Sequence, residues 1–404
     1  MKFSKLSQLC LVSVLGLGVA TLLSGCLLMT LDYVFVASSS GNTAGSSGLI
    51  ETFAADGQTG ALRPVSQVAN SGGSNPVSLA ISADYVNLYA ANQGNNSIVH
   101  FTIGTDGTLT KNDAVTAPFT PDSIAVSTNG KFLYAVGGSN PGLLAVYPLS
   151  SGTIGSLAAT LNLTLPGYTG DMIVPTGVNV LANSSAVVVS AYDKSAYNPG
   201  GTVTSSANPG WVYSFSAGSN GTLTAAAGSP FQAGVKPSAL TSDPTSRFVY
   251  VTDYASNQLV GYTVQNGAVL NFLLNGPFRT GNEPASVAID PRGIYLYVAN
   301  SLQNSVTGYV IDQGTGTPTV VVNTQGGAAL GTDAQPLSIV VDPALGRYVY
   351  TANSLGNTIS GFRLDPNTGA LSSTQATPYP TTGAYPSAIA AVPHGNHAVQ
   401  IVTP

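Results

Sequence analysis

The stretch EPASVAIDPRGIYLYVAN, residues 283–300, recurs almost unchanged as QPLSIVVDPALGRYVYTAN, residues 335–353. Each copy joins two runs of β-forming residues through a turn that contains Asp, Pro and Gly. Weaker copies begin at Pro76, Pro121, Pro175 and Pro237, and a last partial copy begins at Pro386. A unit that recurs about every 50 residues, without helical periodicity, indicates the blades of a β-propeller.

The two ends of the chain predict how the ring closes. The first strand-like run, residues 33–37, matches the second strand of the repeat and lacks a first strand before it. The run 386–392 matches a first strand, so we expect it to complete the N-terminal blade. The first-strand motifs predict an all-β propeller of about seven four-stranded antiparallel blades, and the tail after residue 396 leaves six or eight open.

The composition limits the function. Charged residues make up 7 % of the chain, against about 25 % in an average soluble protein. The formal net charge is -5 and no cluster of Lys or Arg occurs in the sequence, which excludes nucleic acid as a partner. The 46 Gly and 25 Pro describe a chain that turns often, which excludes a helical bundle.

The N-terminus has the features of an export signal. Lys2 and Lys5 precede an apolar run, 9–23, that is short for a membrane span, and the run ends in Leu-Ser-Gly-Cys26. This ending resembles a bacterial lipobox. We therefore expect a signal peptide over 1–25, a lipidated Cys26 with a short tether over 26–32, and one monomeric propeller domain over 33–404. Leu27 in place of Asp favours the outer membrane, with the domain on its periplasmic or surface face.

The repeat also resembles a known family. Tyr-Val-Ala-Asn300 is similar to the YVTN-type propeller repeat, and the whole unit with its Thr-Gly-Ala-Leu turn resembles the seven-bladed lactonase family. That family includes 6-phosphogluconolactonases and muconate-lactonising enzymes, so the resemblance implies a lactone hydrolase or cycloisomerase. Its catalytic members place Arg, His and Glu at the channel mouth. Here the corresponding positions read Asn282-Glu283-Pro284, without His, and Asn300-Ser301-Leu302, with Ser in place of the carboxylate.

Candidate site residues lie on one face of the predicted ring. In a blade, the loop that leads into the first strand and the turn between the second and third strands share the face around the channel. The long insertion 193–211 carries the only Trp of the chain and, with its aromatic and Asn residues, suits contacts with a glycan or peptide. The candidates for binding at the channel are Asp193, Lys194, Trp211, Lys236, Asp253, Tyr254, Glu283, Asn300 and Asn353. The alternative for the Asn and Asp residues is that they only satisfy turn backbone.

The remaining reactive residues point to no cofactor. His100 in a third strand and His394 and His397 in the tail are expected at surface or edge positions, and none has metal-ligand spacing. We expect no metal and no cofactor. The sequence therefore favours a binding or scaffolding module of the cell envelope, with a glycan, peptide or envelope protein as partner. The alternatives are a lactone hydrolase or cycloisomerase with relocated catalytic residues, and a cation-binding structural module.

Overall fold

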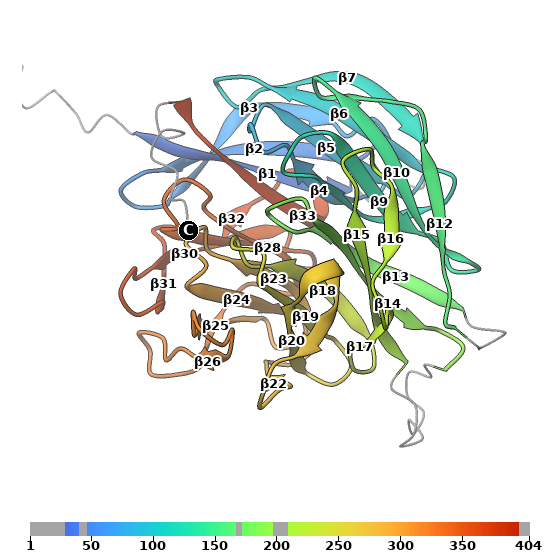
Figure 1. Ribbon diagram of the computed structural model, residues 1–404. Coiled ribbons are helices and arrows are strands. Elements are labelled where there is room, and N and C mark those ends of the chain that lie inside the picture. The colour runs from blue at the N-terminus through green and yellow to red at the C-terminus, as the bar shows by residue number, and fades with distance from the viewer. Residues whose placement is uncertain (1–28, 40–46, 167–171, 197–208, 396–404) are drawn as a thin grey trace, which may run out of the picture.

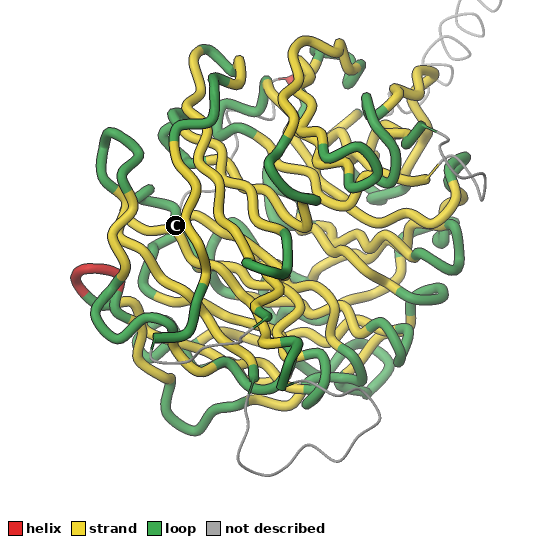
Figure 2. Tube along the Cα trace, turned by 90° about the vertical axis from the view of Figure 1, so that its right-hand side faces the viewer, coloured by secondary structure: helices red, strands yellow, loops and turns green. Residues whose placement is uncertain are grey.

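Seven antiparallel sheets arranged around a common centre make up the protein in the computed structural model, which describes residues 29–39, 47–166, 172–196 and 209–395 (Figure 1). Almost all of this chain is strand or loop, as Figure 2 shows, and η1 (Asn266–Ala268) is a short 3-10 turn. The predicted seven-bladed all-β propeller is confirmed. None of the described helices is long and apolar enough to span a membrane.

The first three blades are numbered in chain order from the N-terminal strand. Blade 1 contains β33 (Ala384–Pro393), β1 (Thr30–Ser39), β2 (Leu49–Asp56) and β3 (Leu62–Asn70). Blade 2 contains β4 (Pro76–Ile81), β5 (Asn87–Asn92), β6 (Ser97–Ile103) and β7 (Leu109–Thr116). Blade 3 contains β8 (Pro121–Val126), β9 (Phe132–Gly137), β10 (Gly142–Ser150), β11 (Thr153–Ile154) and β12 (Ala159–Leu163).

The other four blades follow the same plan. Blade 4 contains β13 (Ile173–Val180), β14 (Ala186–Asp193), β15 (Gly210–Ala217), β16 (Leu223–Ala225) and β17 (Phe231–Gln232). Blade 5 contains β18 (Pro237–Ser242), β19 (Phe248–Asp253), β20 (Gln258–Val264), β21 (Leu270–Phe272) and β22 (Phe278–Arg279). Blade 6 contains β23 (Pro284–Ile289), β24 (Tyr295–Asn300), β25 (Ser305–Ile311), β26 (Pro318–Val320) and β27 (Ala329–Gly331). Blade 7 contains β28 (Pro336–Val341), β29 (Tyr348–Asn353), β30 (Thr358–Leu364), β31 (Leu371–Ser373) and β32 (Tyr379–Pro380).

The outermost strand is split in blades 3 to 7, which the sequence pattern does not show. Its two short pieces pair with different halves of the third strand, as β11 and β12 do with β10. Each piece is too short to cover the whole edge of the third strand, so the second piece supplies the remaining backbone partners.

The ring closes through the C-terminal strand, as the sequence predicts. Strand β33 pairs with β1 in antiparallel register, with Phe35 opposite Ala390, and thus supplies the first strand that the N-terminal blade lacks. Strand β1 begins at Thr30, three residues before the predicted start. The first strands of neighbouring blades are in contact around the whole ring, from β4 to β33 and back to β4.

Serine side chains link the first strands of neighbouring blades. Ser78 Oγ accepts the backbone N–H of Ile124 at 3.2 Å, and Ser387 Oγ donates to the carbonyl of Pro76 at 2.5 Å. Such bonds involve Ser78, Ser123, Ser238, Ser286, Ser338 and Ser387. Each of these serines stands one or two positions after the proline that opens a first strand, so this part of the repeat helps to fix the spacing of the blades. At the junction of β13 and β18, Gly177 stands at this position.

The core consists of seven apolar clusters, one between each pair of adjacent blades. Buried tyrosines of the second strands cross these interfaces, and the hydroxyls of Tyr250 and Tyr297 donate to the carbonyls of Gly316 and Gly369 in the next blade at 2.6 and 2.8 Å. Both glycines have positive φ in the turn before the outermost strand, where other residues are strained. The Tyr and Gly positions of the repeat therefore form one interblade contact.

Candidate functional site

The candidate residues gather on one face of the ring because the strands of each blade are antiparallel. The loops that lead into the first strands end on the same face as the turns between second and third strands. The turns between first and second strands and between third and fourth strands lie on the opposite face. We call the first of these the channel face.

Two candidate carboxylates hold loops together instead of facing a ligand. Asp253 is buried at the end of β19, and its two oxygens accept the N–H groups of Val235 and Lys236 at 2.9 and 2.8 Å. Asp193 is buried at the end of β14, and its Oδ1 accepts the N–H groups of Met172 and Ser195 at 3.0 and 2.9 Å. Both carboxylates thus satisfy backbone donors of the channel-face loops.

The two candidate asparagines serve the same purpose. Asn300 is buried at the end of β24, where its Oδ1 accepts the N–H of Gly281 at 3.0 Å and its Nδ2 donates to Thr307 Oγ1 at 2.9 Å. Asn353 is buried at the end of β29, and its Nδ2 donates to Ser360 Oγ at 2.9 Å. Both side chains therefore satisfy local polar groups, which is the alternative expected for turn residues.

Two candidates, Lys194 and Trp211, stand near the two ends of the insertion. Lys194 is exposed after β14, and its backbone N–H donates to the carbonyl of Met172 at 2.9 Å. Trp211 is the second residue of β15 and packs against the apolar cluster between blades 3 and 4. Its indole nitrogen is buried with no hydrogen-bond partner among the described residues. Tyr197 and the rest of the insertion through residue 208 lie outside the described residues.

The other three candidates converge. The hydroxyl of Tyr254, which follows β19, donates to Glu283 Oε2 at 2.5 Å. The ammonium of Lys236, in the loop before β18, lies 4.9 Å from the ring centroid of Tyr254 and 5.6 Å from that of Tyr192. Both distances fit a cation held against aromatic faces. We call Tyr192, Lys236, Tyr254 and Glu283 the channel-mouth cluster.

Backbone contacts fix the position of Glu283 in this cluster. The residue precedes β23 with a φ of 53°, and its N–H donates to Asn257 Oδ1 at 2.7 Å. Its carbonyl accepts the N–H and the hydroxyl of Ser301 at 2.8 and 2.9 Å. The side chain of Glu283 therefore starts from a rigid backbone that blades 5 and 6 share.

The surroundings of Lys236 in the channel-mouth cluster shift its pKa in two opposite directions. Burial lowers the pKa of its ammonium below the ordinary lysine value, and the nearby Glu283 carboxylate opposes that shift. A carboxylate, a phenol and a cation with reduced proton affinity are therefore within reach of one bound molecule. Such a set can remove a proton from water and stabilise an oxyanion.

Sequence reasoning did not place Tyr192 among the candidates, and it missed Asn257. Asn257, Asn304 and Asn357 all have positive φ, and their Oδ1 atoms accept the N–H of Glu283, Gln335 and Tyr385. The signal is in the sequence: each Asn ends the turn before a third strand, and each donor immediately precedes a repeat proline.

The expectation that His100 is a surface or edge residue is wrong. Its side chain is 3 % exposed, stacks on Tyr89 at 5.0 Å, and contacts Asp113 Oδ1 at 2.6 Å and Asn87 Oδ1 at 2.8 Å. Asp113 Oδ2 also accepts the N–H of Ile154 at 2.8 Å, so His100 belongs to the contact between blades 2 and 3. His394 is partly buried against Tyr33, and His397 lies outside the described residues.

The described residues contain no group of three or more His, Cys, Asp and Glu that could hold a metal ion. A cation site in this part of the chain would therefore have to use carbonyl or amide oxygens beside at most two such side chains. Cys26 lies outside the described residues.

Comparison with known proteins gives the family-level context. The family described as "Lactonase, 7-bladed beta-propeller" matches residues 34–172 and 272–391. The fold is similar to a periplasmic gluconolactonase of Pseudomonas aeruginosa, with a TM-score of 0.72, 18 % identity, and 91 % of this chain and 100 % of that chain covered. It is also similar to a putative 6-phosphogluconolactonase of Bacteroides fragilis, with a TM-score of 0.70, 19 % identity, and 91 % and 99 % covered. The search of curated proteins found no match.

Proposed function

This chain belongs to the family of lactonases with a seven-bladed β-propeller, and we propose that it hydrolyses a lactone at the channel-mouth cluster. The observation that carries the proposal is the convergence of Lys236, Tyr254 and Glu283 at the channel face. A neutral rim of Asn and Tyr would have favoured the binding module that the sequence ranks first. An acid group and a cation side by side favour the hydrolase alternative.

The proposed reaction uses Glu283 as the base. Its Oε2 accepts the Tyr254 hydroxyl, which leaves Oε1 to take a proton from water. The water oxygen attacks the lactone carbonyl, and the Lys236 ammonium stabilises the negative charge that develops on the carbonyl oxygen. The ring C–O bond then breaks, and the proton held by Glu283 passes to the leaving alkoxide. The product is the open hydroxy acid.

The charges of the cluster favour a substrate without a phosphate group. One ammonium and one carboxylate give the cluster no net charge, whereas a phosphate would bring nearly two negative charges next to Glu283. We therefore propose an uncharged lactone, such as an aldonolactone, as the substrate class.

The test is the hydrolysis of glucono-δ-lactone and dihydrocoumarin by the purified full chain, followed as acid release. We expect Glu283→Gln, which keeps an acceptor for Tyr254, to lower kcat/KM about 100-fold or more. Lys236→Met should lower it by a similar factor. Lys131→Met is the matched control because Lys131 is an exposed cation on the opposite face. No turnover above background, or full activity in Glu283→Gln, would refute the proposal; the first result would favour the binding or scaffolding function.

We also propose that lipidation of Cys26 holds the protein at the cell envelope, which rests on the lipobox-like ending Leu-Ser-Gly-Cys26. Cells that express the full chain should incorporate labelled palmitate into it, and Cys26→Ser should abolish both the label and membrane association. Equal labelling of the variant would contradict this proposal.

A further inference from the structure

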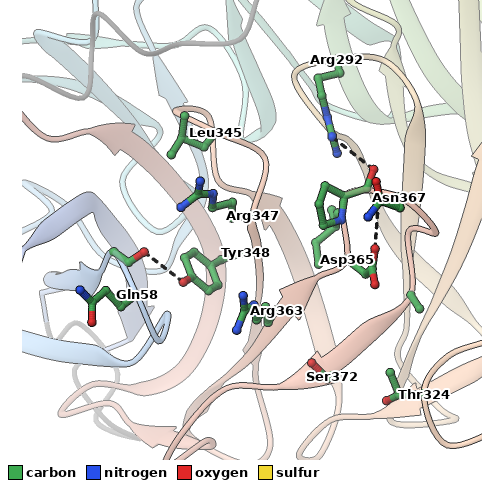
Figure 3. Close-up of a pocket in the computed structure, with 14 residues that line it drawn as sticks. Gln58, Arg292, Thr324, Leu345, Arg347, Tyr348, Arg363, Asp365, Asn367 and Ser372 are labelled. Atoms are coloured by element: carbon green, nitrogen blue, oxygen red, sulfur yellow. Dashed lines mark hydrogen bonds between the residues drawn. The ribbon is translucent and has the colours of Figure 1, made fainter.

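A separate cavity of about 840 Å³ lies on the face opposite the channel face, where turns of blades 6, 7 and 1 meet (Figure 3). Arg292 comes from the turn after β23, and Gln58 comes from the turn after β2. Arg347 and Asp365 come from two turns of blade 7, after β28 and after β30, and Arg363 comes from the end of β30. The volume is in the range of roughly 300–1,000 Å³ that small-molecule sites occupy. We call this the arginine cavity.

The arginine cavity concentrates positive charge in a chain that has little charge. The chain has six arginines, Arg63, Arg247, Arg279, Arg292, Arg347 and Arg363, and the last three line this cavity. Asp365 is the one acidic residue in the lining, and its Oδ1 accepts the N–H groups of Asn367 and Thr368 at 2.8 and 3.2 Å. Three cations against one carboxylate leave the lining with a net charge of +2 in a protein of net charge -5.

The guanidinium groups retain unused donors. Arg292 Nε donates to Asp290 Oδ2 at 2.7 Å, but its Nη2 is buried with no hydrogen-bond partner among the described residues. Arg347 and Arg363 are exposed, and the described part of the chain gives neither an ion pair. Figure 3 shows Arg347 and Arg363 near Tyr348, with Arg292 across the cavity beside the turn that holds Asn367.

Apolar surface lies between these donors. Leu345, Tyr348, Leu364, Pro366 and Ala370 also line the cavity. The Tyr348 hydroxyl donates to the carbonyl of Gly57 in blade 1 at 3.3 Å, and Arg292 Nη1 donates to the carbonyl of Pro366 at 3.5 Å. These contacts hold the turns of three blades around one space. A carbon skeleton can pack on the apolar surface while the planar guanidinium forks bind oxyanions in pairs.

We propose that the arginine cavity binds a small organic polyanion with at least two carboxylate or phosphate groups. One group meets Arg347 and Arg363, and the other meets Arg292. This site is separate from the channel-mouth cluster and does not depend on the proposed lactone hydrolysis.

Arg247 shows that position in the repeat alone does not produce such a site. It occupies in blade 5 the position of Arg347 in blade 7, because both residues follow an Asp turn, and both backbone N–H groups donate to that Asp. Arg247 Nε donates to Thr245 Oγ1 at 2.9 Å, and its guanidinium lies 4.9 Å from the ring centroid of Phe248. It is absent from the lining of the arginine cavity, so it provides the matched control.

The experiment is calorimetric titration of the purified full chain with citrate and with inorganic pyrophosphate, and sucrose is the uncharged control. We expect saturable 1:1 binding of at least one anion, none of sucrose, and weaker binding at higher salt. The double variant Arg347→Gln/Arg363→Gln should weaken binding at least about tenfold, whereas Arg247→Gln should not change it. The stronger of the two anions identifies carboxylate or phosphate as the preferred group.

Three results would overturn the proposal. The first is no binding of either anion up to about 10 mM, which is weaker than any useful site of this kind. The second is wild-type affinity in the double variant, whose folding is checked by its circular dichroism spectrum and urea midpoint. The third is an equal loss in Arg247→Gln, which would show that the anions respond only to overall charge.

Discussion

The hydroxyl of Tyr350 in blade 7 donates a hydrogen bond of 2.9 Å to the carbonyl of Gly60 in blade 1, 290 residues earlier in the chain. Burial raises the pKa of this hydroxyl well above its ordinary value, which favours the protonated form that donates this bond. The bond joins the last complete repeat to the blade that contains both ends of the ring. It is the counterpart, at the closure, of the bonds from Tyr250 and Tyr297.

Tyr350→Phe should destabilise the protein by about 1–2 kcal/mol, because it removes this donor and leaves the Gly60 carbonyl buried without it. The measurement is the midpoint of urea unfolding at constant slope. Tyr385→Phe is the control, since Tyr385 is 39 % exposed, and it should leave the midpoint unchanged. Equal midpoints for the wild type and Tyr350→Phe would show that the closure does not depend on this bond.

Gly316→Ala tests the other half of the interblade contact. A Cβ at Gly316 would lie 2.4 Å from Phe248 Cδ1, and the φ of +75° already disfavours a side chain. Gly130 has a φ of +68°, and no atom lies within 4 Å of the position that its Cβ would take. Gly130→Ala therefore tests the backbone strain without a steric clash. We expect Gly130→Ala to cost about 1 kcal/mol and Gly316→Ala clearly more. Equal urea midpoints for the two variants would mean that Phe248 moves away without cost.

The repeat explains why so much of the fold could be predicted. The proline and the nearby serine of the first strand, the buried Tyr and the turn Gly recur from blade to blade, and their contacts are between adjacent copies of the same motif. The number of blades follows from the pairing of β33 with β1. The sequence alone does not show whether the tail adds another strand.

The site was less predictable because it depends on differences between blades. Asp253 and Glu283 look alike in the sequence, each as an acidic residue at a channel-face loop. Asp253 is buried against its own loop, whereas Glu283 extends to Tyr254 of the preceding blade. Which role a turn residue takes is decided by the neighbouring blade, and a single repeat does not contain that information. The arginine cavity was missed for the same reason, since its arginines come from two turns and from strand β30 of two blades.

Asp122 should make stability depend on pH. Burial raises the pKa of this carboxyl to about 6, although Gln93 Nε2 donates to its Oδ1 at 2.8 Å. The folded state therefore holds this proton more tightly than the unfolded state does. The proton's contribution to folding stability is full below the pKa of Asp in the unfolded chain, about 4, and is lost as the pH rises through 6. Asp122→Asn, which keeps the acceptor for Gln93, should stabilise the protein at pH 7 by at most about 3 kcal/mol.

Urea unfolding at several pH values between 4 and 7 measures this effect, and the advantage of Asp122→Asn should disappear near pH 4. Asp312→Asn is the control of opposite sign, because hydrogen bonds from Thr315 and Gly314 lower the pKa of Asp312. That variant should lose stability at pH 7, and its deficit should shrink in acid. A constant difference between the wild type and Asp122→Asn at all pH values would contradict the assignment.

Lys236 gives a test of the channel-mouth cluster that does not require turnover. Burial lowers the pKa of its ammonium and the Glu283 carboxylate raises it, so Glu283→Gln should lower this pKa further. Because only the neutral amine is acylated, Lys236 in Glu283→Gln should react faster with a dilute acylating reagent near pH 8 than in the wild type. Mass spectrometry of the digested protein gives the rate for each lysine, and exposed Lys194 serves as the internal control with an unchanged rate. An unchanged or slower rate at Lys236 would show that the Glu283 carboxylate does not raise the pKa of this ammonium. That result would contradict the proposal that Glu283 acts as the base beside Lys236 as the stabilising cation.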